Sequence, residues 1–133
     1  MNIIITNIKW VMVTAGLLTC SMIFAVFAPQ AALISMFGEA LSEPLAQVVV
    51  RSWGFLIFLM GTLLIYGAYK PVYRNLSLVI VGLSKVVFIS LIIIFGAQYV
   101  EKSAVTLILD SIFTALFVVY LIKVKMFSNK KLK

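Results

Sequence analysis

Four long apolar runs constrain this chain more than any other feature of its sequence. A helix needs roughly 20 consecutive apolar residues to cross the hydrocarbon core of a bilayer, and each run is about that long or longer. The predicted membrane spans are approximately 8–28, 45–69, 75–98 and 103–124. The first run exceeds the apolar core of a secretory signal, which is about 7–15 residues, so we interpret it as a permanent span.

Composition favours a membrane protein over a soluble domain. Of the 133 residues, 64% are hydrophobic and 11% are charged. This leaves too little polar surface for a protein in water, whereas lipid solvates helices that are apolar all round. We therefore expect an all-α integral membrane protein, an antiparallel four-helix bundle that forms a single transmembrane domain over residues 1–133.

The basic residues predict the orientation of the chain. Lys9 lies at the start of the first run, and Lys70 and Arg74 lie between the second and third. Further lysines lie at the end of the fourth run and after it: Lys123, Lys125, Lys130, Lys131 and Lys133. The other two connections contain Glu39, Glu43 and Glu101, with a single Lys102. Because cytoplasmic loops are enriched in Lys and Arg, we expect cytoplasmic N- and C-termini, with residues 125–133 as a basic cytoplasmic tail.

A net charge of +7 would suggest a nucleic-acid partner in a soluble protein. Here the basic residues flank apolar runs, where they act as topology signals and contact anionic headgroups. We therefore expect membrane lipid as a partner, and no nucleic acid.

The segment 29–44 is the longest predicted connection. Its stretch 31–37 is too apolar for open solvent and too short to span a bilayer. We expect a short interfacial helix in this first outer loop, lying on the membrane surface or folded over the mouth of the bundle. It could be a simple connector on the helix ends, or a lid over a binding site.

Small residues predict where the helices approach one another, because helices in lipid associate through close packing. Gly16 and Cys20 are four residues apart in the first run. The second run carries one stripe at steps of three and four: Arg51, Gly54, Phe58, Gly61 and Ile65. We expect Gly54 and Gly61 to admit a neighbouring helix, and Arg51 to point into the bundle.

Arg51, Lys85 and Asp110 are ionisable residues within the runs. A charge near the bilayer centre costs about 2.5–3.5 kcal/mol on insertion scales, so such residues are expected to face inward and pair. The helical rise places Asp110 between the two cations in depth, within reach of both. The cluster could be an interhelical ion pair that fixes the packing, a ligand, quinone or lipid site, or part of a proton or ion path.

One carboxylate against two cations leaves a formal charge of +1, which is unfavourable at low dielectric. Lys85 could lose its proton, Arg51 could extend to the outer interface, or the site could accept an anionic or electron-rich ligand. Trp53 and Gln98, near the outer ends of their runs, are further candidate contacts. Trp53 could stack on a ligand or anchor the chain at the interface.

The chain lacks several residue types that catalysis or metal binding commonly uses. It has no histidine, and its one cysteine, Cys20, lies inside the first run. The usual nucleophile and metal-ligand sets therefore cannot be assembled. Phosphate-loop, dinucleotide-binding and haem-attachment motifs are also missing from the sequence. We expect no catalytic residue, no metal site and no resident cofactor, although a quinone or lipid could bind.

Short motifs along most of the chain resemble those of a known group. They are Ala28-Pro29, Met36-Phe37-Gly38, Arg51-Ser52-Trp53-Gly54 with Gly61, Ser84-Lys85 and Asp110. Together they resemble small bacterial four-helix integral membrane proteins of the DoxX-like type. The resemblance implies a helical bundle in a bacterial inner membrane. Some members of that group are subunits of membrane oxidoreductases that pass electrons to quinone, and others are accessory or assembly factors.

These observations predict an accessory or ligand-, lipid- or quinone-binding subunit of a membrane complex. It would work with a membrane protein partner or as a homo-oligomer. The alternative is a small-solute or ion transporter or channel, which would require an oligomer because four spans enclose little volume. A membrane enzyme acting on lipid or quinone is a third hypothesis, and we rank it last because the chain lacks the usual catalytic groups.

Overall fold

The computed structural model describes residues 2–132, and the regular elements within them are all helical. In chain order they are α1 (Asn2–Cys20), η1 (Ser21–Ile23), α2 (Phe24–Phe27), α3 (Pro29–Phe37), α4 (Pro44–Tyr69), α5 (Pro71–Phe95), η2 (Ala97–Tyr99) and α6 (Ala104–Lys131). Four helical stretches are long and apolar enough to cross a bilayer: Thr6–Phe27, Pro44–Tyr69, Pro71–Phe95 and Ala104–Lys131. The predictions of an all-helical chain and of four such helices are confirmed.

The last two spans differ from the prediction at their ends. α5 begins at Pro71 rather than at residue 75, because the fixed φ of proline suits the first position of a helix. α6 continues to Lys131, through most of the segment predicted as a tail. That segment contains no proline or glycine, and extending an existing helix adds one hydrogen bond per residue without a new nucleation step.

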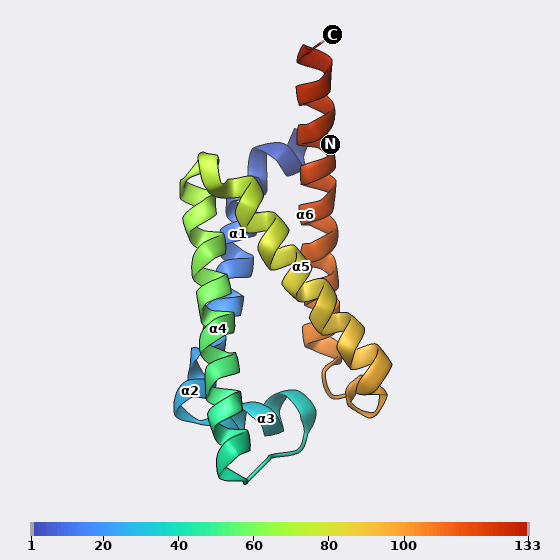
Figure 1. The fold of residues 1–133 in the computed structure, drawn as a ribbon. Helices are drawn as coiled ribbons and strands as arrows, with labels where there is room; N and C mark the ends of the chain where they lie inside the picture. The colour runs from blue at the N-terminus through green and yellow to red at the C-terminus, as the bar shows by residue number, and fades with distance from the viewer. Residues whose placement is uncertain (1, 133) are drawn as a thin grey trace.

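The long helices form two layers that separate toward one end (Figure 1). α1 lies along α4, and the turn at Lys70 sends α5 back from the end of α4. α5 then leans away from α4 and contacts α6. α1 begins and α6 ends at the same end of the molecule, which we call the terminal end, and α6 extends beyond the other helices there. The opposite end, where α3 lies, is the α3 end.

Glycines allow the first and second spans to approach closely. A Cβ on Gly61 would lie 2.6 Å from the Gly16 carbonyl oxygen and 2.6 Å from Cys20 Sγ. A Cβ on Gly54 would lie 2.6 Å from Ala25 Cβ. These separations are shorter than real Cβ contacts, so a larger residue would push the helices apart. The close approach at Gly54 and Gly61 agrees with the prediction from the stripe of small residues.

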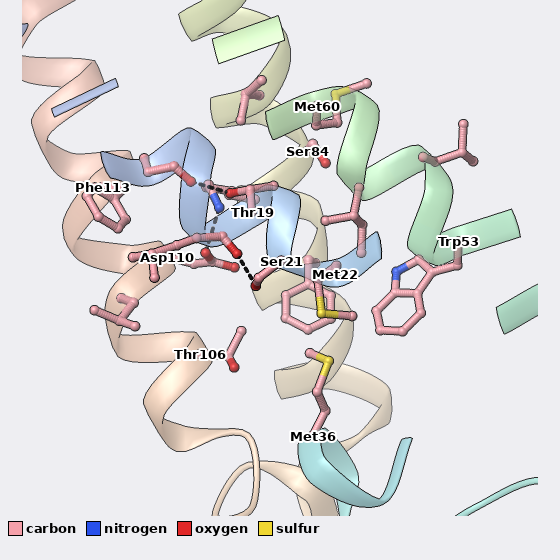
Figure 2. A pocket seen from close by; sticks show the side chains of 18 of the residues that line it. Thr19, Ser21, Met22, Met36, Trp53, Met60, Ser84, Thr106, Asp110 and Phe113 are labelled. Atoms are coloured by element: carbon pink, nitrogen blue, oxygen red, sulfur yellow. Dashed lines mark hydrogen bonds and ion pairs between the residues drawn. The ribbon is translucent and has the colours of Figure 1, made fainter. Parts of the chain in front are cut away.

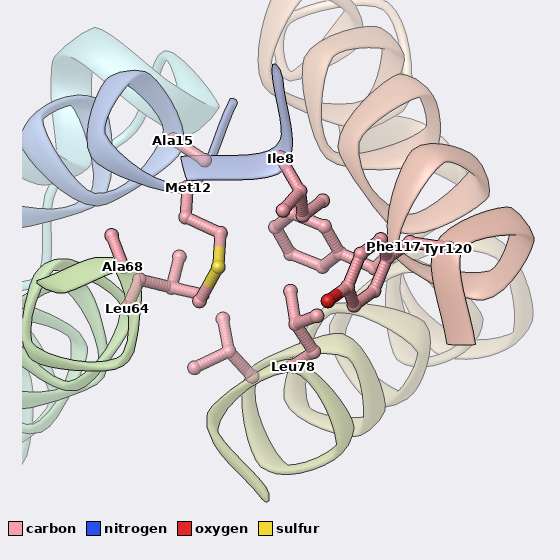
Figure 3. Packing of buried hydrophobic residues seen from close by; sticks show 9 residues of the cluster. Ile8, Met12, Ala15, Leu64, Ala68, Leu78, Phe117 and Tyr120 are labelled. Atoms are coloured by element: carbon pink, nitrogen blue, oxygen red, sulfur yellow. The ribbon is translucent and has the colours of Figure 1, made fainter. Parts of the chain in front are cut away.

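The hydrophobic core occupies the terminal half of the molecule, and Figure 3 shows its side chains packed between the helices. All four long helices contribute to it: Ile8, Met12, Ala15, Leu64, Ala68, Leu78, Val81, Phe117 and Tyr120. Met12, Leu64 and Leu78 are completely buried. Side chains therefore fill the space between the two layers at this end.

α4 and α5 are held together near the turn that joins them. A Cβ on Gly67 would lie 2.5 Å from Ser77 Oγ, which shows how closely the backbones approach. Arg74 donates hydrogen bonds to the carbonyl oxygens of Gly67, at 3.3 Å, and Ala68, at 2.7 Å. These carbonyls lie in the last turn of α4, where a helix has no further N–H donors of its own. Farther from the turn the two helices separate (Figure 1).

α3 is the short helix predicted in the first loop. It begins at Pro29, after Ala28 leaves the helical conformation, and ends at Phe37. The next residue, Gly38, has a left-handed φ of 76°, which favours glycine. Ser103, just before α6, donates a hydrogen bond from Oγ to the Met36 carbonyl oxygen at 2.9 Å. This bond joins α3 to the connection between α5 and α6.

Candidate ligand-binding site

A cavity of about 610 Å³ lies in the half of the molecule nearer α3. It begins where the core ends, and Ala15 and Val81 belong to both. Its walls come from all four long helices, and α3 contributes Ser35 and Met36 (Figure 2). The volume falls within the range of about 300–1,000 Å³ that is usual for small-molecule sites. The separation of α5 from α4 therefore leaves a space large enough for a ligand.

An ion pair joins α5 to α6 on the wall of this cavity. Lys85 Nζ lies 2.6 Å from Asp110 Oδ1, within hydrogen-bond distance. The Lys85 side chain is 9% exposed and that of Asp110 is 16% exposed. Burying two charges is costly, and a direct hydrogen bond between them offsets part of that cost. Among the described residues that line the cavity, only these two are ionisable.

The polar groups of the wall retain hydrogen-bonding capacity. A lysine ammonium has three N–H donors, and the bond to Asp110 uses one of them. Thr19 and Ser21 donate their hydroxyl protons to carbonyls of their own span, at 2.7 and 2.5 Å. Their oxygens can still accept hydrogen bonds. The remaining hydroxyl groups on the wall belong to Ser35, Ser84 and Thr106.

The rest of the wall is apolar and adaptable. Its large side chains include Met22, Met36, Met60, Trp53, Phe88 and Phe113. Methionine is flexible and polarisable, so it adapts to ligands of different shape. The Phe37 ring lies 6.3 Å from the Trp53 ring and meets the Tyr99 ring edge-on at 5.7 Å. These contacts hold α3 against both layers, and the cavity as a whole suits an amphiphilic molecule.

The position of Arg51 corrects the expectation that it points into the bundle and can reach Asp110. Its side chain is exposed, and Nη1 donates a hydrogen bond to the Val26 carbonyl oxygen. α2 ends at Phe27, so carbonyls in its last turn lack donors from their own helix. A cation is also favourable beside a helix C-terminus. Arg51 is therefore bound at the end of the first span, and the formal charges on the cavity wall total zero rather than +1.

The other two predicted contacts lie in different places. Trp53 lines the cavity, whereas Gln98 is exposed in η2 and is absent from the described lining. Sequence reasoning missed Thr19 and Ser21 as wall residues. Hydroxyl groups inside an apolar run were a signal for them, although the helical periodicity alone did not show which face they occupy.

The described residues contain no group of three or more His, Cys, Asp or Glu side chains that could hold a metal ion. The arrangement can bind a molecule through hydrogen bonds and apolar contacts. Comparison of the chain with protein-family models, with curated proteins and with solved structures finds no match.

Proposed function

We propose that this protein is a binding subunit of the membrane, which holds a lipid-soluble small molecule such as a quinone or a lipid in the cavity between its helices. One observation carries the proposal: a cavity of about 610 Å³ has a largely buried ion pair, Lys85–Asp110, on an otherwise largely apolar wall. A few convergent polar groups in an apolar cavity are the usual composition of a ligand site.

The core favours binding over transport. Met12, Leu64, Leu78 and Phe117 are buried between the layers on the terminal side of the cavity. A solute crossing a single copy of the chain would have to displace these side chains. The transporter hypothesis therefore needs an oligomer or a large rearrangement, whereas a binding function uses the cavity as it stands.

We further propose that the terminal end faces the cytoplasm of a bacterium, with the chain in the inner membrane. The basic residues of this end support the orientation. Lys9 Nζ lies 4.4 Å from the centre of the Tyr69 ring, a cation–π contact suited to an interface. The resemblance to DoxX-like proteins supports the bacterial inner membrane and a role as an accessory subunit in an antiparallel four-helix bundle.

The test is to identify what co-purifies with the tagged protein in mild detergent, by mass spectrometry of extracted small molecules and of proteins. Thr106→Phe would place a ring in the cavity, because Thr106 lines it. Val105→Phe is the matched control, because Val105 is 72% exposed and outside the lining. We expect a bound small molecule in the wild type and in the Val105 variant, and its loss from the Thr106 variant.

A stoichiometric protein that co-purifies with the chain would identify the complex in which the subunit works. Equal amounts of the small molecule in both variants would place it outside the cavity and refute the proposal. Solute flux through purified protein in liposomes, blocked by Thr106→Phe alone, would instead support the transporter.

A further inference from the structure

We infer that the cavity selects an amphiphile whose headgroup is uncharged and carries hydroxyl groups, as a monoacylglycerol does. The inference rests on the proposed binding function and specifies its ligand class. It depends on the charge balance of the cavity and on the hydrogen-bonding groups left over on its wall.

The charge balance excludes a strongly ionic ligand. Lys85 and Asp110 are the ionisable residues of the described lining, and their charges cancel. Arg51, which would have made the cluster cationic, is held by the Val26 carbonyl. An anionic or cationic headgroup would therefore bring an uncompensated charge into an environment that penalises it. A neutral headgroup carries no such penalty.

The hydrogen-bonding groups require a headgroup that both donates and accepts. Lys85 offers the N–H groups that its bond to Asp110 does not use. Asp110 offers carboxylate oxygen, and Thr19 and Ser21 offer hydroxyl oxygens whose protons are already committed to the backbone. A hydroxyl group donates one hydrogen bond and accepts others. A headgroup with two or more hydroxyls can thus pair with both members of the ion pair, while the apolar chain lies against Trp53 and the other large side chains.

The experiment compares four probes that share an oleyl or oleoyl chain: monoolein, methyl oleate, oleyl sulfate and oleyltrimethylammonium. The chain contains two tryptophans, so a Trp10→Phe background leaves Trp53, on the cavity wall, as the reporter. Each probe is titrated into the protein in phosphatidylcholine nanodiscs, and Trp53 emission is followed. We expect monoolein to bind at least about tenfold more tightly than either charged probe, because an unpaired charge is penalised there. Methyl oleate should bind more weakly than monoolein because it lacks hydroxyl donors.

Single substitutions in the ion pair should change the preferred probe from an uncharged to a charged one. Asp110→Asn leaves Lys85 as an unpaired cation, so oleyl sulfate should become the preferred probe. Lys85→Met leaves Asp110 unpaired, so oleyltrimethylammonium should become preferred. Lys70→Met removes an exposed cation outside the cavity, and it should keep the wild-type order.

The double variant Lys85→Met/Asp110→Leu guards against misfolding of the single variants, because an apolar replacement of a whole buried pair is often neutral. It should bind methyl oleate as tightly as monoolein. A wild type that prefers a charged probe, or single variants that keep the wild-type order, would overturn the inference and leave the binding function standing. Failure of every probe to change Trp53 emission, together with no co-purified molecule, would overturn both. A hydroquinone with a similar apolar chain, tested in parallel, distinguishes a hydroxylated ring from a glycerol headgroup.

Discussion

A single methyl group added at Gly61 should force the first and second spans apart. The new Cβ of Gly61→Ala would lie 2.6 Å from the Gly16 carbonyl oxygen, 2.6 Å from Cys20 Sγ and 2.7 Å from Cys20 N. Ordinary van der Waals contacts begin at 3.4 Å, so the helices must separate by ~0.8 Å to admit the methyl group. A gap of that size loses a quarter to a half of the dispersion energy of each surrounding contact between the two helices. Overpacking of this kind costs about 1–3 kcal/mol.

We expect the free energy of unfolding to fall by an amount near the top of that range, because two of the three obstructing atoms belong to the backbone and cannot rotate away. The higher helix propensity of alanine offsets about 1 kcal/mol of this destabilisation. The net fall in the free energy of unfolding should therefore be about 2 kcal/mol. Gly82→Ala is the matched control, since the nearest atom to its new Cβ, Phe117 Cδ2, is 3.9 Å away. This variant should be neutral or more stable by up to about 1 kcal/mol.

The assay is unfolding by sodium dodecyl sulfate in mixed micelles, followed by circular dichroism. Combining Cys20→Ala with Gly61→Ala removes the contact with sulfur but leaves both backbone contacts, so stability should recover only in part. Equal stability of the Gly61→Ala and Gly82→Ala proteins would refute the close packing of α1 against α4.

Other variants probe the helix ends and the orientation. Arg51→Gln should lower the free energy of unfolding by about 0.3–1 kcal/mol in the same assay, because the Val26 carbonyl loses a cationic donor at a helix C-terminus. A larger decrease would indicate that Arg51 pairs within the core. Ser103→Ala removes the hydrogen bond to the Met36 carbonyl, which contributes about 0.5–1.5 kcal/mol, so hydrogen exchange should become faster in α3 while α4 stays protected. Unchanged exchange in α3 would contradict a role of this bond in holding α3. In a chain without its own cysteine, Ser128→Cys should react with a membrane-impermeant maleimide only after the cells are opened, and labelling of intact cells would reverse the proposed topology.

The sequence predicted the elements of the fold better than their ends. Apolar runs determine which stretches can enter a bilayer, and the four candidate spans follow from that local property. Helix ends depend on finer effects. Pro71 begins α5 instead of belonging to the turn before it, and α6 continues to Lys131 because nothing in the tail interrupts it.

The candidate site was predictable only in part. Lys85 and Asp110 were recognisable as costly charges within apolar runs, and the structure brings them together. The same reasoning placed Arg51 beside them, because depth along a straight helix was the available guide. The helix ends before Pro29, which leaves backbone carbonyls near Arg51 without donors. One of them, the Val26 carbonyl, accepts a hydrogen bond from the Arg51 guanidinium.

By itself, the sequence determined the class of this protein, the number of candidate spans and the identity of the ionisable residues within them. These properties follow from the composition of each segment, and composition does not depend on how the segments pack. Only the tertiary structure decided which cation pairs with Asp110, that α5 leans away from α4, and that a cavity lies between them. Each of these depends on the angle and separation of neighbouring helices, which arise from contacts such as Gly61 against Gly16 and Gly67 against Ser77. The stripe of small residues predicted which face of the second span is closely approached, but the partner residue on the other helix leaves no periodic pattern within a single helix, and for that reason it could not be predicted from the sequence.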